Sequence, residues 1–247
     1  MILALSRGGS HEATLAALPG INTSSDCYSF VNNSWFCPAY LTDRRAELLA
    51  ATQEHIWITV VSVLLGALVA YPLALLARRS PAVSAVVLGG STIVYTIPSL
   101  AMFSLMLIPP LPGISPWSVV IGLALYTLTI LVRSMVAGLE AVPEEVRDAA
   151  RGLGYGPVAL LLRIETPLAM PVIIAGLRVA TVSTVALLTV GSILGYGGLG
   201  NLIRLGVATS FKAQILTASV LCVVLAFAFD ALLLGVQRVA LPWRRGR

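Results

Sequence analysis

The residues that could do chemistry in this sequence are concentrated in one polar stretch, Glu144–Pro167. It carries seven charged side chains, out of 16 basic and 11 acidic residues in the whole chain. Among those charges, Ala149 and Ala150 are small enough to let another surface approach closely. Charges around small residues suit docking against another protein in water better than catalysis. We therefore expect a docking segment here, with an ordinary solvated loop as the alternative.

Catalytic and metal-binding groups are scarce elsewhere. The two histidines, His11 and His55, stand far apart, and Cys222 is a lone cysteine in an apolar run, where cysteine more often packs than reacts. Lys212 is the only lysine, which leaves no room for the phosphate-binding motif G-x-x-x-x-G-K-[ST]. We therefore expect no catalytic residue, no metal site and no cofactor bound by this chain.

The composition indicates a membrane protein. Of 247 residues, 57% are hydrophobic and 11% are charged, and the mean hydropathy is +0.92. Soluble domains carry about a quarter charged residues. The net charge of +5 does not predict nucleic-acid binding, because the arginines stand in short clusters at the ends of apolar segments, which is typical of membrane proteins.

Five apolar segments are long enough to cross a bilayer, which requires about 20 apolar residues. They comprise residues 56–77, 83–108, 117–139, 168–194 and 213–236. The expected fold class is thus all-α, with about five transmembrane helices. The chain divides into a polar N-terminal segment (1–54), a membrane domain (55–238) with a polar loop (140–166), and a basic tail (239–247).

The arginines also predict how the chain is oriented. The loop after the first span, the 140–166 loop and the C-terminus share one side of the bilayer. That side carries Arg78, Arg79, Arg147, Arg151, Arg163, Arg238, Arg244, Arg245 and Arg247. The short loops of the other side carry only Arg204 and Lys212. By the positive-inside rule the arginine-rich side is cytoplasmic, so the N-terminus is outside and the C-terminus inside.

The external N-terminal segment contains two cysteines, Cys27 and Cys37, among Ser, Asn, Tyr and Trp. An oxidising compartment favours disulfide formation. We therefore predict a bond between them, with two unpaired thiols as the alternative.

The fourth span carries one arginine and four hydroxyl residues on a common face. At about 100° per residue they fall within an arc roughly 140° wide. They are Arg178, Thr181, Thr184, Thr189 and Ser192. A polar face along an apolar helix predicts the wall of a water-filled translocation path. Alternatively, each hydroxyl bonds to a carbonyl in the preceding turn of its own helix.

Besides Arg133, near the far end of the third span, two charged residues lie inside apolar spans, Arg178 and Asp230. The rise of a helix puts both at similar depth toward the arginine-rich side. A charge in lipid is costly and ordinarily finds a partner or a cavity. We predict an intramembrane ion pair, with direct substrate contact as the alternative.

Two backbone features interrupt the spans. Pro98, in the middle of the second span, predicts a structural kink. Residues 195–200 read Gly-Tyr-Gly-Gly-Leu-Gly, which matches G-x-G-x-x-G. They follow a membrane helix and not a strand, so they indicate a tight external turn or a close helix approach, not a dinucleotide site.

The polar stretch also carries a family resemblance. Asp148-Ala149-Ala150, then Gly154, then Ile164-Glu165-Thr166-Pro167 keep the spacing of the EAA loop of bacterial ABC-importer permeases, with Asp148 in place of Glu and Thr166 in place of Leu. In that family the loop docks on an ATPase subunit. The resemblance thus implies a cytoplasmic coupling loop that contains Asp148, Ala149, Ala150, Arg151, Gly154, Ile164 and Pro167.

The same resemblance implies a type I ABC-importer permease fold in a multi-pass protein of the bacterial cytoplasmic (inner) membrane. Its implied partners are ABC ATPase subunits that use ATP, a second permease copy or paralogue, an extracytoplasmic substrate-binding protein and membrane lipid, without nucleic acid. Three segments further resemble glycine betaine, carnitine and choline (osmoprotectant) permeases: Thr96–Leu100, Ala175–Arg178 and Gly197–Gly200. The methionine-type permeases share the five-span plan and are the alternative.

Two other functional classes fit the sequence less well. A secondary transporter needs coupling-ion carboxylates near the membrane midplane, and Asp230 is the only acid within the predicted spans. A membrane-embedded enzyme needs converging polar groups, which the sequence does not indicate.

Overall fold

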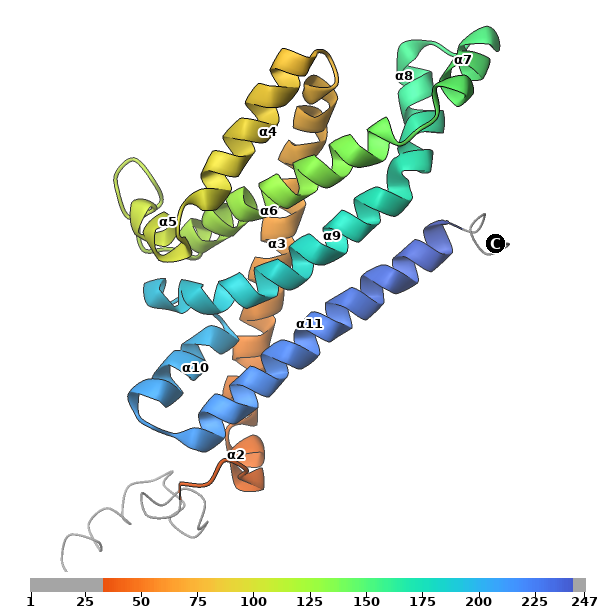
Figure 1. Ribbon diagram of the computed structural model, residues 1–247. Coiled ribbons are helices and arrows are strands. Elements are labelled where there is room, and N and C mark those ends of the chain that lie inside the picture. The colour runs from red at the N-terminus through yellow and green to blue at the C-terminus, as the bar shows by residue number, and fades with distance from the viewer. Residues whose placement is uncertain (1–32, 242–247) are drawn as a thin grey trace, which may run out of the picture.

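The computed structural model describes residues 33–241 (Figure 1), and every regular element in this range is a helix. This confirms the all-α class. The elements in chain order are α2 (Pro38–Asp43), α3 (Arg45–Ala77), α4 (Pro81–Thr96), α5 (Ser99–Leu105), α6 (Pro116–Glu140), α7 (Glu144–Gly152), α8 (Pro157–Leu160), the π-helical turn η2 (Leu161–Glu165), α9 (Thr166–Leu188), the 3-10 turn η3 (Thr189–Leu194), α10 (Leu199–Ala208) and α11 (Lys212–Ala240).

Four of the predicted spans correspond to the long apolar helices α3, α6, α9 with η3, and α11. The helix α3 is longer than expected, because it begins at Arg45. Its 33 residues extend about 50 Å at 1.5 Å per residue, which exceeds the roughly 30 Å hydrocarbon core. Its first turns therefore project beyond the membrane core.

The second predicted span is broken rather than kinked. The helices α4 and α5 meet at an angle of 95°, so the expectation of a kink at Pro98 was too mild. Ile97 is extended (φ −65°, ψ 124°), the conformation that a following proline favours. The hydroxyl of Tyr126 donates a hydrogen bond to the Ile97 carbonyl. A side chain of α6 thus satisfies a carbonyl left without a helical partner.

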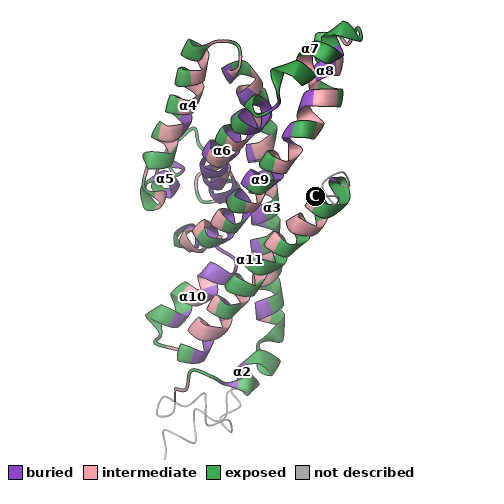
Figure 2. Ribbon diagram, turned by 45° about the vertical axis from the view of Figure 1, so that its right-hand side comes forward, coloured by how far each residue is buried: buried purple, intermediate pink, exposed green. Residues whose placement is uncertain are grey.

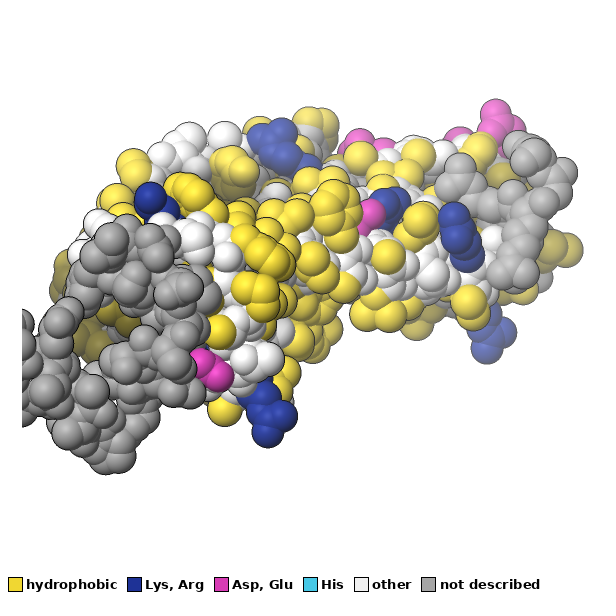
Figure 3. Space-filling view, turned by 90° about the horizontal axis from the view of Figure 1, so that it is seen from below, with side chains coloured by type: hydrophobic (Ala, Val, Ile, Leu, Met, Phe, Trp, Pro, Cys, Tyr) yellow, Lys and Arg dark blue, Asp and Glu magenta, His cyan; other side chains and the backbone are white. Residues whose placement is uncertain are grey.

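The centre of the molecule is formed by α3, α6 and α9, whose buried residues are purple in Figure 2. Small residues let these helices approach closely, as is common inside membranes. A Cβ on Gly66 would overlap the Thr127 hydroxyl, and one on Gly176 would overlap that of Ser134. Hydrophobic side chains are prominent on the face seen in Figure 3, as expected of a chain surrounded by lipid.

The glycine-rich stretch forms both a tight turn and a close contact. Gly195 has φ +83°, and Gly198 has φ +52°, a region that favours glycine. A Cβ on Gly198 would lie 2.8 Å from the backbone of His55 in α3. The turn leads into α10, a short apolar helix that the sequence did not predict and that packs on α11 and α3.

Candidate functional site

The polar stretch folds into two short helices, α7 and α8, joined by a sharp turn. The helix α7 begins after Pro143 with Glu144 and Glu145 in its first turn, where acids suit the positive end of the helix dipole. Gly154 ends it with φ +86°. The Tyr155 N–H bonds to the Ala150 carbonyl (3.1 Å) and the Gly154 N–H to that of Arg151 (2.9 Å). This is a Schellman cap, which needs a left-handed residue at Gly154.

The α7–α8 end of the molecule projects away from the long helices (Figure 1). Asp148 and Ala149 are exposed, whereas Ala150 is buried and Ile164 and Pro167 are half-buried. Three large apolar side chains are more than half exposed here, and we call them the coupling patch. They are Leu153 (79% exposed), Val158 (70%) and Leu162 (56%). Exposed apolar residues beside charged ones are typical of surfaces that bind another protein.

A buried carboxylate, Glu165, ties this end to the long helices. It accepts two hydrogen bonds from Arg78, at 2.7 Å and 3.1 Å. The Nε of Arg147 lies 2.8 Å from Glu165 Oε1, in the geometry of an ion pair rather than an aligned hydrogen bond. We call Arg78, Arg147 and Glu165 the Glu165 junction. It connects the end of α3, the helix α7 and the start of α9.

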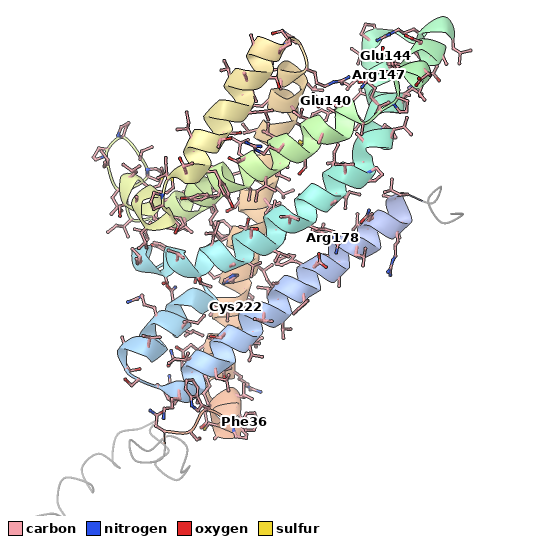
Figure 4. All side chains as sticks on the ribbon, viewed as in Figure 1. Phe36, Glu140, Glu144, Arg147, Arg178 and Cys222 are labelled. Carbon is pink, nitrogen blue, oxygen red and sulfur yellow. The ribbon has the colours of Figure 1, made fainter. Side chains whose placement is uncertain are left out.

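Arg147 extends this junction to a fourth element. Its guanidinium bonds to the Leu139 carbonyl of α6 (2.7 Å) and to Glu144 (2.7 Å), which lies beside it at the base of α7 (Figure 4). The bonds from Arg147 and then from Arg151 hold the pKa of the Glu144 carboxyl below its usual value. The base of α7 is thus fixed by charged hydrogen bonds.

Sequence reasoning did not include the Glu165 junction among the site residues. Arg78 and Glu165 are 87 residues apart, and no local pattern connects them. The available signal was an acid at the edge of an apolar span next to arginine clusters, since a buried charge needs a partner.

Arg178 and Asp230 form the predicted ion pair. Two parallel hydrogen bonds of 2.8 Å join the guanidinium to the carboxylate, and Arg178 stands between α9 and α11 (Figure 4). In the most apolar 18-residue stretch of α11 no residue is buried within the described chain. The ion pair is therefore a specific polar contact between α9 and α11, a helix that is otherwise little buried in the described protein.

The predicted polar face of the fourth span does not lie open. Thr181, Thr184 and Ser192 are buried, and Thr189 is half-buried. The Thr181 and Thr184 hydroxyls donate to the carbonyls four residues earlier, at 2.8 and 2.7 Å. That is the alternative interpretation of the pattern, because a hydroxyl satisfied within its own helix can be packed inside the protomer.

The exposed face of α9 is the apolar one. Val179 of α9 is 57% exposed, and Ile193 of the following turn η3 is 56% exposed, whereas the sequence assigned such residues to faces away from the path. The translocation path along the polar face therefore stays a prediction, and three of its hydroxyl residues are buried in this arrangement.

The remaining candidates from the sequence are the cysteines, His55 and possible metal ligands. Cys37 is disulfide-bonded, while its predicted partner Cys27 lies outside the described residues. Cys222 is free. His55 is fully buried, with Nε2 3.1 Å from the Val185 carbonyl. Within residues 33–241 no three His, Cys, Asp or Glu side chains gather as metal ligands.

Known proteins share both the sequence pattern and the fold. Residues 62–246 match the family described as "binding-protein-dependent transport system inner membrane component". The osmoprotectant import permease protein OsmW of Salmonella typhimurium is 33% identical over 208 residues, which are 82% of this chain and 96% of the relative. The choline transport system permease protein OpuBB of Bacillus subtilis is 32% identical over 203 residues, 82% of this chain and 93% of the relative.

Solved structures support the same architecture. The MetNI methionine ABC transporter in inward-facing conformations contains a chain with a TM-score of 0.70 and 19% identity, and the match covers 83% of this chain and 99% of that one. At this identity the likeness concerns the fold, which is that of a type I importer permease. The family match and the fold agree, and the chain belongs to the family of inner-membrane components of binding-protein-dependent transport systems, in which it is a permease subunit of an ABC importer.

Proposed function

We propose that this permease imports small osmoprotectants such as glycine betaine, carnitine or choline, driven by ATPase subunits that dock on its α7–α8 end. The observation that carries the docking is the coupling patch, three exposed apolar side chains on a projecting charged segment. The printed names of the 30–33% identical relatives support the substrate class. ATP is bound and hydrolysed by the partner in this proposal, and the chain itself binds no cofactor.

Coupling runs through the Glu165 junction in this mechanism. An ATPase that grips α7 and α8 moves Arg147 and Glu144, which share the base of α7. Because Glu165 is held by both Arg147 and Arg78, displacement of α7 pulls on the start of α9 and on the end of α3. These are two of the three central helices. A second permease, identical or paralogous, would complete the path between the two subunits.

The proposed substrates set a limit on the permease's own selectivity. Glycine betaine and carnitine are zwitterions without net charge, so a path for them needs weak polar contacts and no deep charge trap. Two of the charges inside the described spans, Arg178 and Asp230, neutralise each other, and the guanidinium of Arg133 in α6 bonds to the Thr92 hydroxyl. Tight recognition, which for quaternary ammonium groups uses aromatic faces, is assigned to an extracytoplasmic binding protein.

Uptake measurements test this function. The chain is expressed with its ATPase and binding protein in bacteria that lack other osmoprotectant importers, and labelled glycine betaine, choline, carnitine and methionine are offered. Accumulation of one or more quaternary ammonium compounds that stops when ATP is depleted is the expected result. Uptake of methionine alone would establish the alternative substrate. Uptake that survives ATP depletion but collapses with the ion gradient would indicate a secondary transporter.

A matched pair of variants tests the docking. Leu153→Asp places a charge in the coupling patch, whereas Leu111→Asp changes an exposed leucine (42% exposed) in the loop at the other end of the molecule. We expect the first to lose co-purification of the ATPase and the second to retain it. Equal retention by both would remove the patch from the mechanism.

A further inference from the structure

A cavity of about 790 Å³ lies between the end of α3 and the α7–α9 segment. Its lining comes from the end of α3, the residues that follow it, α7, α8 and η2, and includes Arg78, Arg151, Tyr155 and Glu165. The coupling patch takes no part in this lining, although Arg151 and Pro157 of the α7–α8 end do. Its size is that of pockets that hold small organic ligands.

The cavity has one apolar wall and one basic rim. On α3 the lining runs from Pro72 through Leu75 and Leu76 to Arg78 and Arg79. At 1.5 Å per residue the apolar end lies about 9 Å deeper along the helix than Arg78. The arginines follow the last turn of a membrane span, so the cavity crosses the boundary between hydrocarbon and water.

Of the three arginines that line the cavity, one has no acidic partner within residues 33–241 and is available to bind an anion. Arg78 is paired with Glu165, and Arg151 with Glu144 and Asp148. Arg79 is exposed and makes no ion pair within residues 33–241. Arg151, which is half-exposed, and Tyr155 add hydrogen-bond donors on the facing wall. The ligand that fits is a single anionic group attached to an apolar body.

We propose that this cavity binds an anionic phospholipid, with its phosphate at Arg79 and Arg151 and its acyl chains against Pro72, Leu75 and Leu76. Basic pockets between membrane helices on the cytoplasmic side are suited to acidic lipid head groups, and the arginine-rich end is the predicted cytoplasmic one. A free phosphate would use the rim but leave the apolar wall in water. An acidic side chain of an ATPase would also bind at the rim and leave the apolar wall exposed to water.

Occupancy of this cavity acts on the Glu165 junction, because Arg78 and Glu165 belong to both. A phosphate beside Arg79 draws the neighbouring guanidinium of Arg78 and competes with Glu165 for it. A bound lipid would thus weaken the Arg78–Glu165 contact that connects α3 with α7 and α9. This inference depends on the cavity alone and not on the transported substrate.

Native mass spectrometry of the full chain in mild detergent tests the binding. The probes are phosphatidylglycerol, phosphatidylcholine and inorganic phosphate. We expect preferential retention of phosphatidylglycerol, reduced about fivefold in Arg79→Gln, since one arginine near an anionic lipid contributes about that factor. Arg163→Gln removes an exposed arginine of the same segment that does not line the cavity, and it should retain the lipid as the unaltered chain does.

A second variant tests the role of the apolar wall. Leu76→Trp fills the cavity from an exposed position (38% exposed), so the fold should tolerate it, and lipid retention should fall. Equal retention of the two lipids, or an unchanged preference in both Arg79→Gln and Leu76→Trp, would overturn the proposal. Displacement of the lipid by inorganic phosphate would assign the rim to a soluble anion. Loss of the lipid when the ATPase binds would assign the cavity to the ATPase.

Discussion

Arg78, the residue that follows α3, and Glu165, the residue that precedes α9, form a two-pronged ion pair with N–O distances of 2.7 and 3.1 Å. The carboxylate also contacts Arg147 of α7 at 2.8 Å. One buried acid therefore holds two arginines from different elements. The helix α7, the proposed docking element, is linked to two central membrane helices through this single side chain.

Replacing Glu165 with Gln should uncouple the transporter. The change leaves Arg78 and Arg147 close together without their shared carboxylate. Removing one partner of a fully buried pair costs roughly 3–5 kcal/mol, and we expect about 2 kcal/mol here because the two arginine side chains are 22% and 14% exposed. Uptake should fall while the chain remains inserted in the membrane.

Glu145→Gln is the control for that change. Glu145 is an exposed acid of α7, the helix that carries Arg147, and it makes no ion pair with another described residue. Uptake and thermal unfolding of purified protein are compared for both variants. If the two variants behave alike, the Glu165 junction has no special role in coupling.

Gly154→Val should disturb the turn between α7 and α8. A Cβ at Gly154 meets no atom within 4 Å, so the penalty comes from the backbone and not from a clash. A left-handed conformation costs a residue with a side chain about 1–2 kcal/mol. We expect normal insertion with loss of ATPase co-purification. Gly152→Val, also with open space but at a helical position, should bind the ATPase normally, and a matching loss there would refute the backbone explanation.

The ion pair of Arg178 and Asp230 can be tested as a structural or a substrate-binding element. Asp230→Asn leaves the arginine without its partner in the membrane, which should lower both stability and uptake. The double variant Arg178→Met and Asp230→Leu removes both charges, and such apolar replacements are often neutral or stabilising. Recovery of uptake in the double variant is expected for a structural pair. A stable but inactive double variant would show that the charges contact the substrate.

Cysteine labelling distinguishes the two faces of α9. In a chain with Cys222 replaced by Ser, we expect Thr184→Cys to resist small water-soluble thiol reagents, because Thr184 is 1% exposed. Val182→Cys, at 36% exposure, should be modified if this face borders the path. Modification at residue 184 with protection at 182 would instead restore the translocation path predicted from the hydroxyl pattern.

The sequence was sufficient for features that depend on local composition. Apolar length defined the spans now seen as α3, α6, α9 and α11, because any helix in lipid must satisfy its backbone internally. The turn at Gly154 was also readable, since a glycine after a short polar helix is a common stop signal. The spacing from Asp148 to Pro167 indicated the family that the comparisons show.

Only the tertiary structure decided which side chains meet. The periodicity of the fourth span shows that Thr181 and Thr184 share a face, but it cannot tell whether water or a neighbouring helix covers that face. The hydroxyls bond to their own helix, so burial against α3 and α6 costs them little. Likewise, proline chemistry allows both a kink and a break at Pro98. At the break of 95°, Tyr126 of another helix bonds to the carbonyl before the proline, a contact that the local sequence does not show.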